Sequence, residues 1–291
     1  MAGGAGAVTV GVMVPGGRGR HDYTALISGT ILVAIALAAL FAPWLAPYPF
    51  DAQDPSRLLQ SPSAAHWLGT DRLGRDLLSR VIYGARVSMT LGVTTALIAT
   101  AFGIAYGMAA GYLGGRTDNL LMRLLDVIYA LPDLLLIILL TILLGRGLTG
   151  MVAALSLVSW VTVARLVRGE VLRLKSADYL DAARALGASH LRIIFVHLLP
   201  LMLGPLLVTL SFRIPSAILA ESTLSFVGIG LAPPTPSWGG MASDGWAAMR
   251  FYPHVIIVPS VAIAVTILAF NVLGDYLNDT LNPRTASAVR R

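Results

Sequence analysis

Long stretches without charged residues dominate this sequence. A helix that crosses the hydrocarbon core of a bilayer needs about 20 consecutive, mainly apolar residues. Six segments meet or approach that length, and their predicted bounds are 23–44, 87–112, 120–144, 148–164, 198–231 and 255–274. The sequence therefore predicts an all-α, polytopic membrane protein with six transmembrane helices.

The composition agrees with this class and excludes several others. Of the 291 residues, 56% are hydrophobic and 12% are charged, whereas a soluble domain carries about 25% charged residues. The chain has no cysteine, which excludes disulfides, thiolate metal sites and thiol catalysis. The net charge of +6 comes mainly from arginines scattered around the apolar segments, so we expect a lipid bilayer and no nucleic acid as partner.

The distribution of Lys and Arg predicts the orientation in the membrane. With the N-terminus inside, thirteen of the 21 basic residues lie on the inner side and seven on the outer side, with Arg213 within the membrane. Cytoplasmic loops carry the excess of positive charge, so both termini are expected in the cytoplasm. The predicted organisation is a disordered cytoplasmic tail (1–22), a first transmembrane helix (23–44), an extracytoplasmic loop (45–86), a five-helix core (87–278) with a cytoplasmic loop (165–198), and a cytoplasmic C-terminal tail (279–291).

Two outer segments do not follow the simple pattern. The loop 45–86 carries five arginines, partly balanced by aspartates, and we expect it to fold against the headgroup region. The segment 231–253 is rich in proline, which gives a rigid surface that either receives an external protein or serves as a lid. Its Trp238 and Trp246 fit an aromatic belt at the membrane interface.

Charged residues also occur within the predicted spans. Asp133, Arg213 and Glu221 are candidates for a translocation path, since charges in a bilayer usually face a bundle interior or an aqueous route. Arg213 and Glu221 are separated by roughly 12 Å along a helix, so they cannot pair with each other. Buried ion pairs with other helices are the alternative. Asp126, near the inner end, is predicted to be structural.

Small residues and prolines punctuate two of the spans. Gly103, Gly107 and Gly111 recur every four residues, so one face of that helix allows another backbone to approach closely. Packing within the chain is the favoured interpretation, and a contact between subunits is the alternative. Prolines in the fifth span remove backbone hydrogen bonds and favour bends; they are Pro200, Pro205 and Pro215.

The cytoplasmic loop contains a short amphipathic segment that runs from Asp181-Ala182-Ala183-Arg184 to Gly187, followed after nine residues by His197-Leu198-Leu199-Pro200. Ser176 is a predicted N-cap, and Gly187 can end the helix in a left-handed conformation. A short helix with small residues on one side suits a groove on another protein. An ordinary interhelical loop is the alternative.

The chain has no nucleotide-binding or catalytic motif of its own. Lys175 is the only lysine and follows Leu174, whereas the P-loop lysine follows glycine. No His-Glu-x-x-His motif occurs, and we expect no catalytic, metal-binding or cofactor-binding residue. If the protein uses ATP, a partner hydrolyses it.

The segment at Asp181 resembles the EAA loop of ABC-importer permeases, with Asp181 in place of glutamate and His197 in place of isoleucine. Further segments resemble C-type permeases of the dipeptide and oligopeptide transport family: His66–Asp71 with Leu73–Asp76, Glu221–Gly230 with Pro233–Gly239, and Ala269–Asn271 with Asn282–Arg284. This resemblance covers nearly everything after the N-terminal tail.

The resemblance implies the type I ABC-importer permease fold and a role in peptide import. It implies a B-type permease as the second membrane subunit, ATPase subunits that bind ATP and Mg, and an extracytoplasmic peptide-binding protein. Asp181, Ala182, Ala183 and Gly187 then occupy the docking motif, which continues to Leu199 and Pro200, with Arg184 beside it. Related permeases handle nickel complexes. An ion-coupled secondary transporter that uses Asp133, Arg213 or Glu221, and an intramembrane enzyme, are the alternatives.

Overall fold

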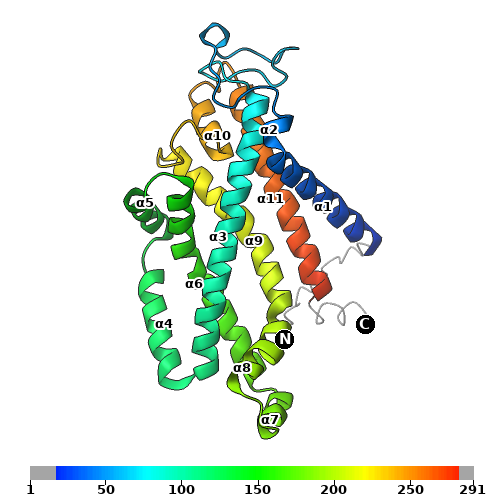
Figure 1. Cartoon of the computed structure of the whole chain (residues 1–291), viewed down its shortest axis with the longest axis vertical. Helices are drawn as coiled ribbons and strands as arrows, with labels where there is room; N and C mark the ends of the chain where they lie inside the picture. The colour runs from blue at the N-terminus through cyan, green and yellow to red at the C-terminus, as the bar shows by residue number, and fades with distance from the viewer. Residues whose placement is uncertain (1–17, 282–291) are drawn as a thin grey trace, which may run out of the picture.

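The computed structural model describes residues 18–281 as an elongated bundle of helices, and this part contains no β-strand (Figure 1). The long helices are α1 (Arg18–Leu40), α3 (Leu77–Leu113), α6 (Leu148–Lys175), α9 (Leu199–Phe226) and α11 (His254–Leu281). The short ones are α2 (Ala42–Leu45), the 3-10 helix η1 (Pro55–Arg57), α4 (Gly115–Tyr129), α5 (Asp133–Leu144), α7 (Asp178–Ala185), α8 (His190–Arg192), the π-helix η2 (Ile193–Leu198) and α10 (Trp238–Trp246). Most of both predicted tails, and the segment Asn282–Arg284, lie outside the described residues.

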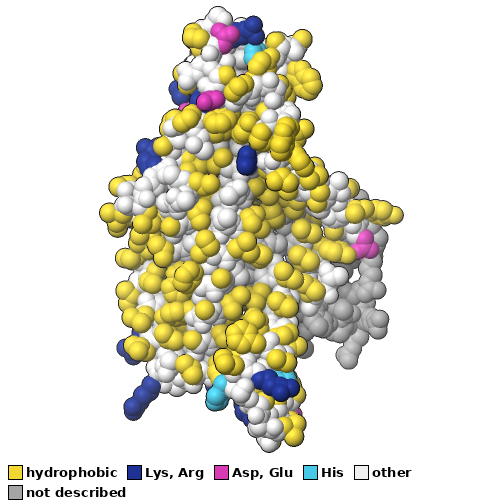
Figure 2. Space-filling view, viewed as in Figure 1, with side chains coloured by type: hydrophobic (Ala, Val, Ile, Leu, Met, Phe, Trp, Pro, Cys, Tyr) yellow, Lys and Arg dark blue, Asp and Glu magenta, His cyan; other side chains and the backbone are white. Residues whose placement is uncertain are grey.

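Five helices are long and apolar enough to cross a membrane, and a sixth span results if α4 and α5 count as one. On the face shown in Figure 2, hydrophobic side chains cover the middle of the bundle, and Lys and Arg gather toward its two ends. The α7 end and the α10 end are opposite ends of the molecule (Figure 1). The chain is thus an all-α, multi-pass membrane protein.

The third predicted span, 120–144, is not one helix. It consists of α4 and α5, whose axes differ by 83° across the break between Tyr129 and Asp133. Pro132 explains the break, because proline disfavours helical backbone at the residue before it and lacks an N–H to continue the hydrogen-bond ladder. Counting apolar residues does not detect such an interruption.

Other helix ends also differ from the predicted spans. α1 begins at Arg18 within the predicted tail, and α11 continues to Leu281 beyond the predicted core. α3 begins at Leu77 instead of Val87, because the Asp76 carboxylate accepts a hydrogen bond from the Ser79 backbone N–H and caps the helix there. α9 continues through Pro205 and Pro215, so the expected bends do not interrupt it.

The glycines of α3 pack within the chain, against α6. A Cβ atom added at Gly103 would lie 2.5 Å from Cβ of Val163, and one at Gly107 would lie 2.4 Å from the backbone oxygen of Ala164. At Gly111 the added atom would lie 2.9 Å from Cβ of Val171. Such spacings leave no room for a side chain. The backbones of α3 and α6 therefore approach closely at all three glycines.

The α10 end is a compact cap made by the segment before α3 and by α10. Trp238, the first residue of α10, is buried, and its Nε1 donates to the backbone oxygen of Val81 in α3 at 3.0 Å. It is therefore a core residue and not part of an interfacial aromatic belt, in contrast to the prediction. Trp246 is 59% exposed, as an interfacial residue would be.

Candidate functional site

Helix α7 ends as its sequence predicts and begins differently. Gly187 has a φ of +82°, its N–H donates to the oxygen of Arg184, and the N–H of Ala188 donates to the oxygen of Ala183. These two bonds form a Schellman cap, which satisfies carbonyls at the helix end. The N-cap is Ala177 and not Ser176, whose hydroxyl donates to the oxygen of Arg173 at the end of α6.

Leu180 is the one buried side chain of α7. Leu180 is fully buried in a cluster that includes Leu174, Ile193 and Leu198. Leu180 was not among the predicted coupling residues. Of those within α7, Ala182 is exposed, Ala183 is half-buried, and the Asp181 side chain is 71% exposed and pairs with Arg184 at 2.5 Å. α7 is therefore held from one side only.

Leu186, beside the cap, extends the outward surface of α7. Its side chain is 89% exposed, the highest fraction among the large hydrophobic residues that the structure describes as exposed. Its neighbours along the chain include the charged residues Asp181 and Arg184 and the cap residue Gly187. The segment thus presents a small apolar tip with a polar border to whatever contacts this end of the molecule.

Tyr112, near the end of α3, holds both flanks of α7. The ammonium group of Lys175, just before α7, donates to the Tyr112 backbone oxygen at 2.7 Å. The Tyr112 hydroxyl is hydrogen-bonded to Nδ1 of His190, just after α7, at 2.7 Å. The sequence did not indicate this connection, since a lone lysine and a lone histidine far from Tyr112 carry no pattern. It ties the position of α7 to the end of α3.

Replacing Tyr112 by phenylalanine should weaken this connection without removing the ring. We expect uptake of substrate to fall about two- to threefold, since one hydrogen bond contributes roughly 0.5–1.5 kcal/mol. Uptake by cells that express equal amounts of the variant and wild-type permease measures this. Tyr129→Phe is the control, because the Tyr129 ring contacts Arg165 but its hydroxyl has no hydrogen bond to a described residue. Equal uptake by Tyr112→Phe and wild type would contradict the role of the hydroxyl.

Leu199 and Pro200 begin α9 directly after the π-helix η2. Leu199 packs against the cluster that also buries Leu180, and Pro200 is the second residue of α9, which continues from η2 without a break. The residues of the predicted motif are therefore divided between two places. Asp181, Ala182 and Arg184 form an outward surface, whereas Leu199 and Pro200 fix the start of the next span.

Ion pairs at the same end connect α4 to α6. Arg168 donates to both carboxylate oxygens of Asp118, at 2.5 and 2.7 Å. Arg165 pairs with Asp126 at 2.7 Å, which agrees with the structural role expected for Asp126. The Asp118–Arg168 pair was not predicted. Its only signal in the sequence is that opposite charges lie at the ends of neighbouring spans. These contacts hold α4 against the helix that leads into α7.

The three charged residues proposed for a path do not form one cluster. Among the described residues, none of Asp133, Arg213 and Glu221 has an ion-pair partner within 4.0 Å. Arg213 donates to the Thr162 hydroxyl of α6, and Asp133 is exposed at the start of α5. The predicted alternative of buried ion pairs is therefore not what the described residues show.

Glu221 joins α9 to the start of α10. It is fully buried, and its Oε1 accepts hydrogen bonds from the hydroxyls of Ser225 at 2.8 Å and Ser237 at 2.7 Å. Ser237 is the N-cap of α10 and also accepts from the Gly240 N–H. The other carboxylate oxygen of Glu221, Oε2, is buried and has no hydrogen-bond partner among the described residues. The contact with Ser237 attaches the cap to the long helix α9.

Comparison with known proteins identifies the family. Residues 103–287 match the model of the binding-protein-dependent transport system inner membrane component, and residues 18–62 match the N-terminal transmembrane domain of oligopeptide transport permease C. The chain belongs to this permease family. Its members are ABC-importer permeases, a family of non-catalytic membrane subunits.

Relatives of this permease cover nearly its whole length. It is 40% identical to the oligopeptide transport system permease protein OppC of Bacillus subtilis, over 92% of the chain and 88% of the relative. It is 44% identical to the dipeptide transport system permease protein DppC of the same organism, over 92% of the chain and 84% of the relative. It is 41% identical to the glutathione transport system permease protein GsiD of Pectobacterium atrosepticum, over 93% and 90%.

Solved structures support the fold of this permease. A structure titled as an inward-facing conformation of the MetNI methionine ABC transporter aligns with a TM-score of 0.60 at 15% identity, over 71% of this chain and 98% of that chain. An amino acid ABC transporter aligns with a TM-score of 0.50 at 18% identity, over 72% and 94%. At such identities the likeness shows the fold alone, which is the predicted type I ABC-importer permease fold.

Proposed function

We propose that this chain is a membrane subunit of an ATP-driven importer of peptides. Its relatives are named for oligopeptides, dipeptides and glutathione, and all three substrates are peptides. The import of a nickel complex by the same kind of permease is the alternative within the family. The chain forms one half of the path, and a B-type permease forms the other half.

The observation that carries this proposal is that α7 is fixed to the bundle on one face and exposes its other face. A segment that buries Leu180 against the bundle and is tied to α3 at both flanks, with Leu186 exposed beside a glycine cap, has the form of a docking element for another protein. We assign that protein as an ATP-binding cassette subunit, which binds ATP and Mg. This chain then needs no cofactor of its own.

The arrangement suggests how energy reaches the path. When ATP draws the ATPase subunits together, they shift α7, and Tyr112 and the start of α9 transmit the shift to the spans. The bundle acts as an element with two packings, and the ATPase subunits bias the equilibrium between them. In this proposal the α7 end and both termini lie in the cytoplasm, and the α10 end meets the extracytoplasmic binding protein.

The candidate path residues have different roles in this proposal. Glu221 is enclosed between α9 and α10 and holds the cap in place. Asp133 and Arg213 remain candidates for lining the path, since neither is buried. The close α3–α6 packing at the glycines belongs to the frame around which the other helices move.

Transport by the reconstituted complex tests the proposal. We expect peptide uptake into proteoliposomes that contain both permeases and the ATPase subunits when binding protein is outside and ATP is inside. The chain reconstituted alone with a proton gradient should transport nothing. Uptake by the lone chain that follows the gradient would instead establish a secondary transporter and contradict the proposal.

A further inference from the structure

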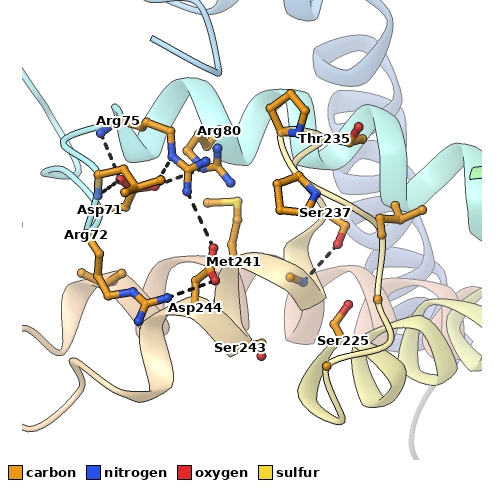
Figure 3. A pocket seen from close by; sticks show the side chains of 18 of the residues that line it. Asp71, Arg72, Arg75, Arg80, Ser225, Thr235, Ser237, Met241, Ser243 and Asp244 are labelled. Carbon is orange, nitrogen blue, oxygen red and sulfur yellow. Dashed lines mark hydrogen bonds and ion pairs between the residues drawn. The ribbon is translucent and has the colours of Figure 1, made fainter. Parts of the chain in front are cut away.

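The α10 end contains a pocket of about 490 Å³ with an excess of positive charge (Figure 3). It lies between the segment before α3, the first turn of α3, the loop 145–147, the loop 228–237 and α10. Four arginines and two aspartates line it: Arg72, Arg75, Arg80, Arg146, Asp71 and Asp244. Four positive and two negative charges leave a formal charge of +2.

The aspartate at the base of the pocket, Asp71, is already paired with groups of this chain. Asp71 accepts from the backbone N–H groups of Leu73 and Arg75, pairs with the Arg75 guanidinium at 2.6 Å, and lies 3.4 Å from Nε of Arg80. Asp71, Arg75 and Arg80 are all buried. This network fixes two guanidinium groups side by side around one carboxylate, so the base keeps a positive charge.

The rim of the pocket is more open. Asp244 is half-exposed and reaches Arg72 at 3.3 Å and Arg75 at 3.7 Å, both of which are long for a charge-assisted hydrogen bond. Arg146 is exposed, and its Nε donates to the backbone oxygen of Gly230 at 3.1 Å. No carboxylate of a described residue lies within 4.0 Å of Arg146. Its remaining N–H groups are available to a ligand.

We propose that this arginine-lined pocket receives an acidic side chain of the extracytoplasmic binding protein when that protein docks. This inference rests on the proposed function, which places the α10 end outside the cell. The guanidinium fork matches a carboxylate with two parallel hydrogen bonds, and a carboxylate reduces the unbalanced charge. Because the base is held by Asp71 and the cap by Glu221, the pocket is already formed before docking.

The position of the pocket favours a protruding side chain of a docked protein. The pocket lies at the end of the molecule opposite α7, and exposed arginines at its rim can attract an acidic surface from a distance. The pocket also explains three arginines before and at the start of α3, which the excess of positive charge on the inner side does not account for. Arg72, Arg75 and Arg80 serve the pocket.

Binding of the substrate-binding protein to the assembled importer in lipid nanodiscs tests this inference. The variant is Arg72→Gln combined with Arg146→Gln, since both side chains lie at the rim and neither is in the buried network. We expect the dissociation constant to rise roughly tenfold at about 50 mM salt, and by less at about 500 mM, mainly through slower association. Arg250→Gln, an exposed arginine at the same end that does not line the pocket, is the control and should bind like wild type.

A charge exchange identifies the partner residue. Arg146→Glu should weaken docking further, and one Asp→Lys or Glu→Lys change on the binding protein should restore it. Equal affinity of the rim variant, Arg250→Gln and wild type would overturn the inference and leave the proposed function intact. A rim variant that docks normally but takes up free peptides more poorly than C-terminally amidated ones would also overturn the inference. The pocket would then bind the carboxylate of the peptide itself. No docking to wild type would contradict the proposed function as well.

Discussion

The Gly187→Val variant should import peptide at less than about a tenth of the wild-type rate while it remains folded in the membrane. Gly187 has a φ of +82°, which costs a non-glycine residue roughly 1–2 kcal/mol and a β-branched residue more. An added Cβ meets no atom within 4 Å, so strain in the backbone, and not a clash, causes the loss. The strain opens the Schellman cap and moves Leu186 away from its docking position.

A change at the same position separates strain from bulk. Asparagine tolerates the left-handed conformation and occurs at such caps, so Gly187→Asn should keep most of the uptake. Rates of labelled-peptide uptake, normalised to the amount of permease in the membrane, measure both variants. If valine and asparagine reduced uptake equally, the effect would come from added volume and the assigned role of the cap would be wrong.

The Gly107→Leu variant should lose stability more than any change at the α7 end. A Cβ atom at this position would lie 2.4 Å from the backbone oxygen of Ala164 and 2.8 Å from Cβ of Val167. Because a backbone atom cannot move aside as a side chain can, α3 and α6 must separate. Overpacking of this kind costs about 3 kcal/mol or more, which lowers the midpoint of thermal unfolding in detergent by roughly 10 °C.

Gly169→Leu is the matched control for this change. Gly169 lies in α6, the helix that packs against Gly107, but an added Cβ there meets nothing within 4 Å. We expect its unfolding midpoint to stay close to wild type. A Gly107→Leu protein that unfolds at the wild-type temperature would contradict the close α3–α6 approach.

Local patterns in the sequence were sufficient for much of this structure. The apolar lengths indicated the spans, the glycine spacing indicated a close helix contact, and Gly187 indicated the end of α7. Each of these depends on residues that are neighbours along one helix or turn. The break at Pro132 was also visible locally, but a count of apolar residues gives proline little weight, so one span was predicted where α4 and α5 meet at 83°.

Contacts between distant segments could not be predicted in the same way. Tyr112 meets His190, and Arg146 meets Gly230, only because the bundle brings separate helix ends together. Glu221 was predicted to line a path or to form a buried ion pair, yet serines and the start of α10 surround it. In each case the partners come from different helices, and no spacing along the chain reports them.

Site-specific cross-linking from α7 tests most directly that this helix is the docking element for an ATPase subunit. The chain has no cysteine, so Leu186→Cys offers a unique attachment point for a photo-crosslinker. We predict that this variant cross-links to the ATPase subunit in the assembled importer, and that Phe251→Cys, a similarly exposed position at the opposite end, does not. Labelling of Leu186→Cys in intact cells by a membrane-impermeant maleimide, with no cross-link to the ATPase, would contradict the account.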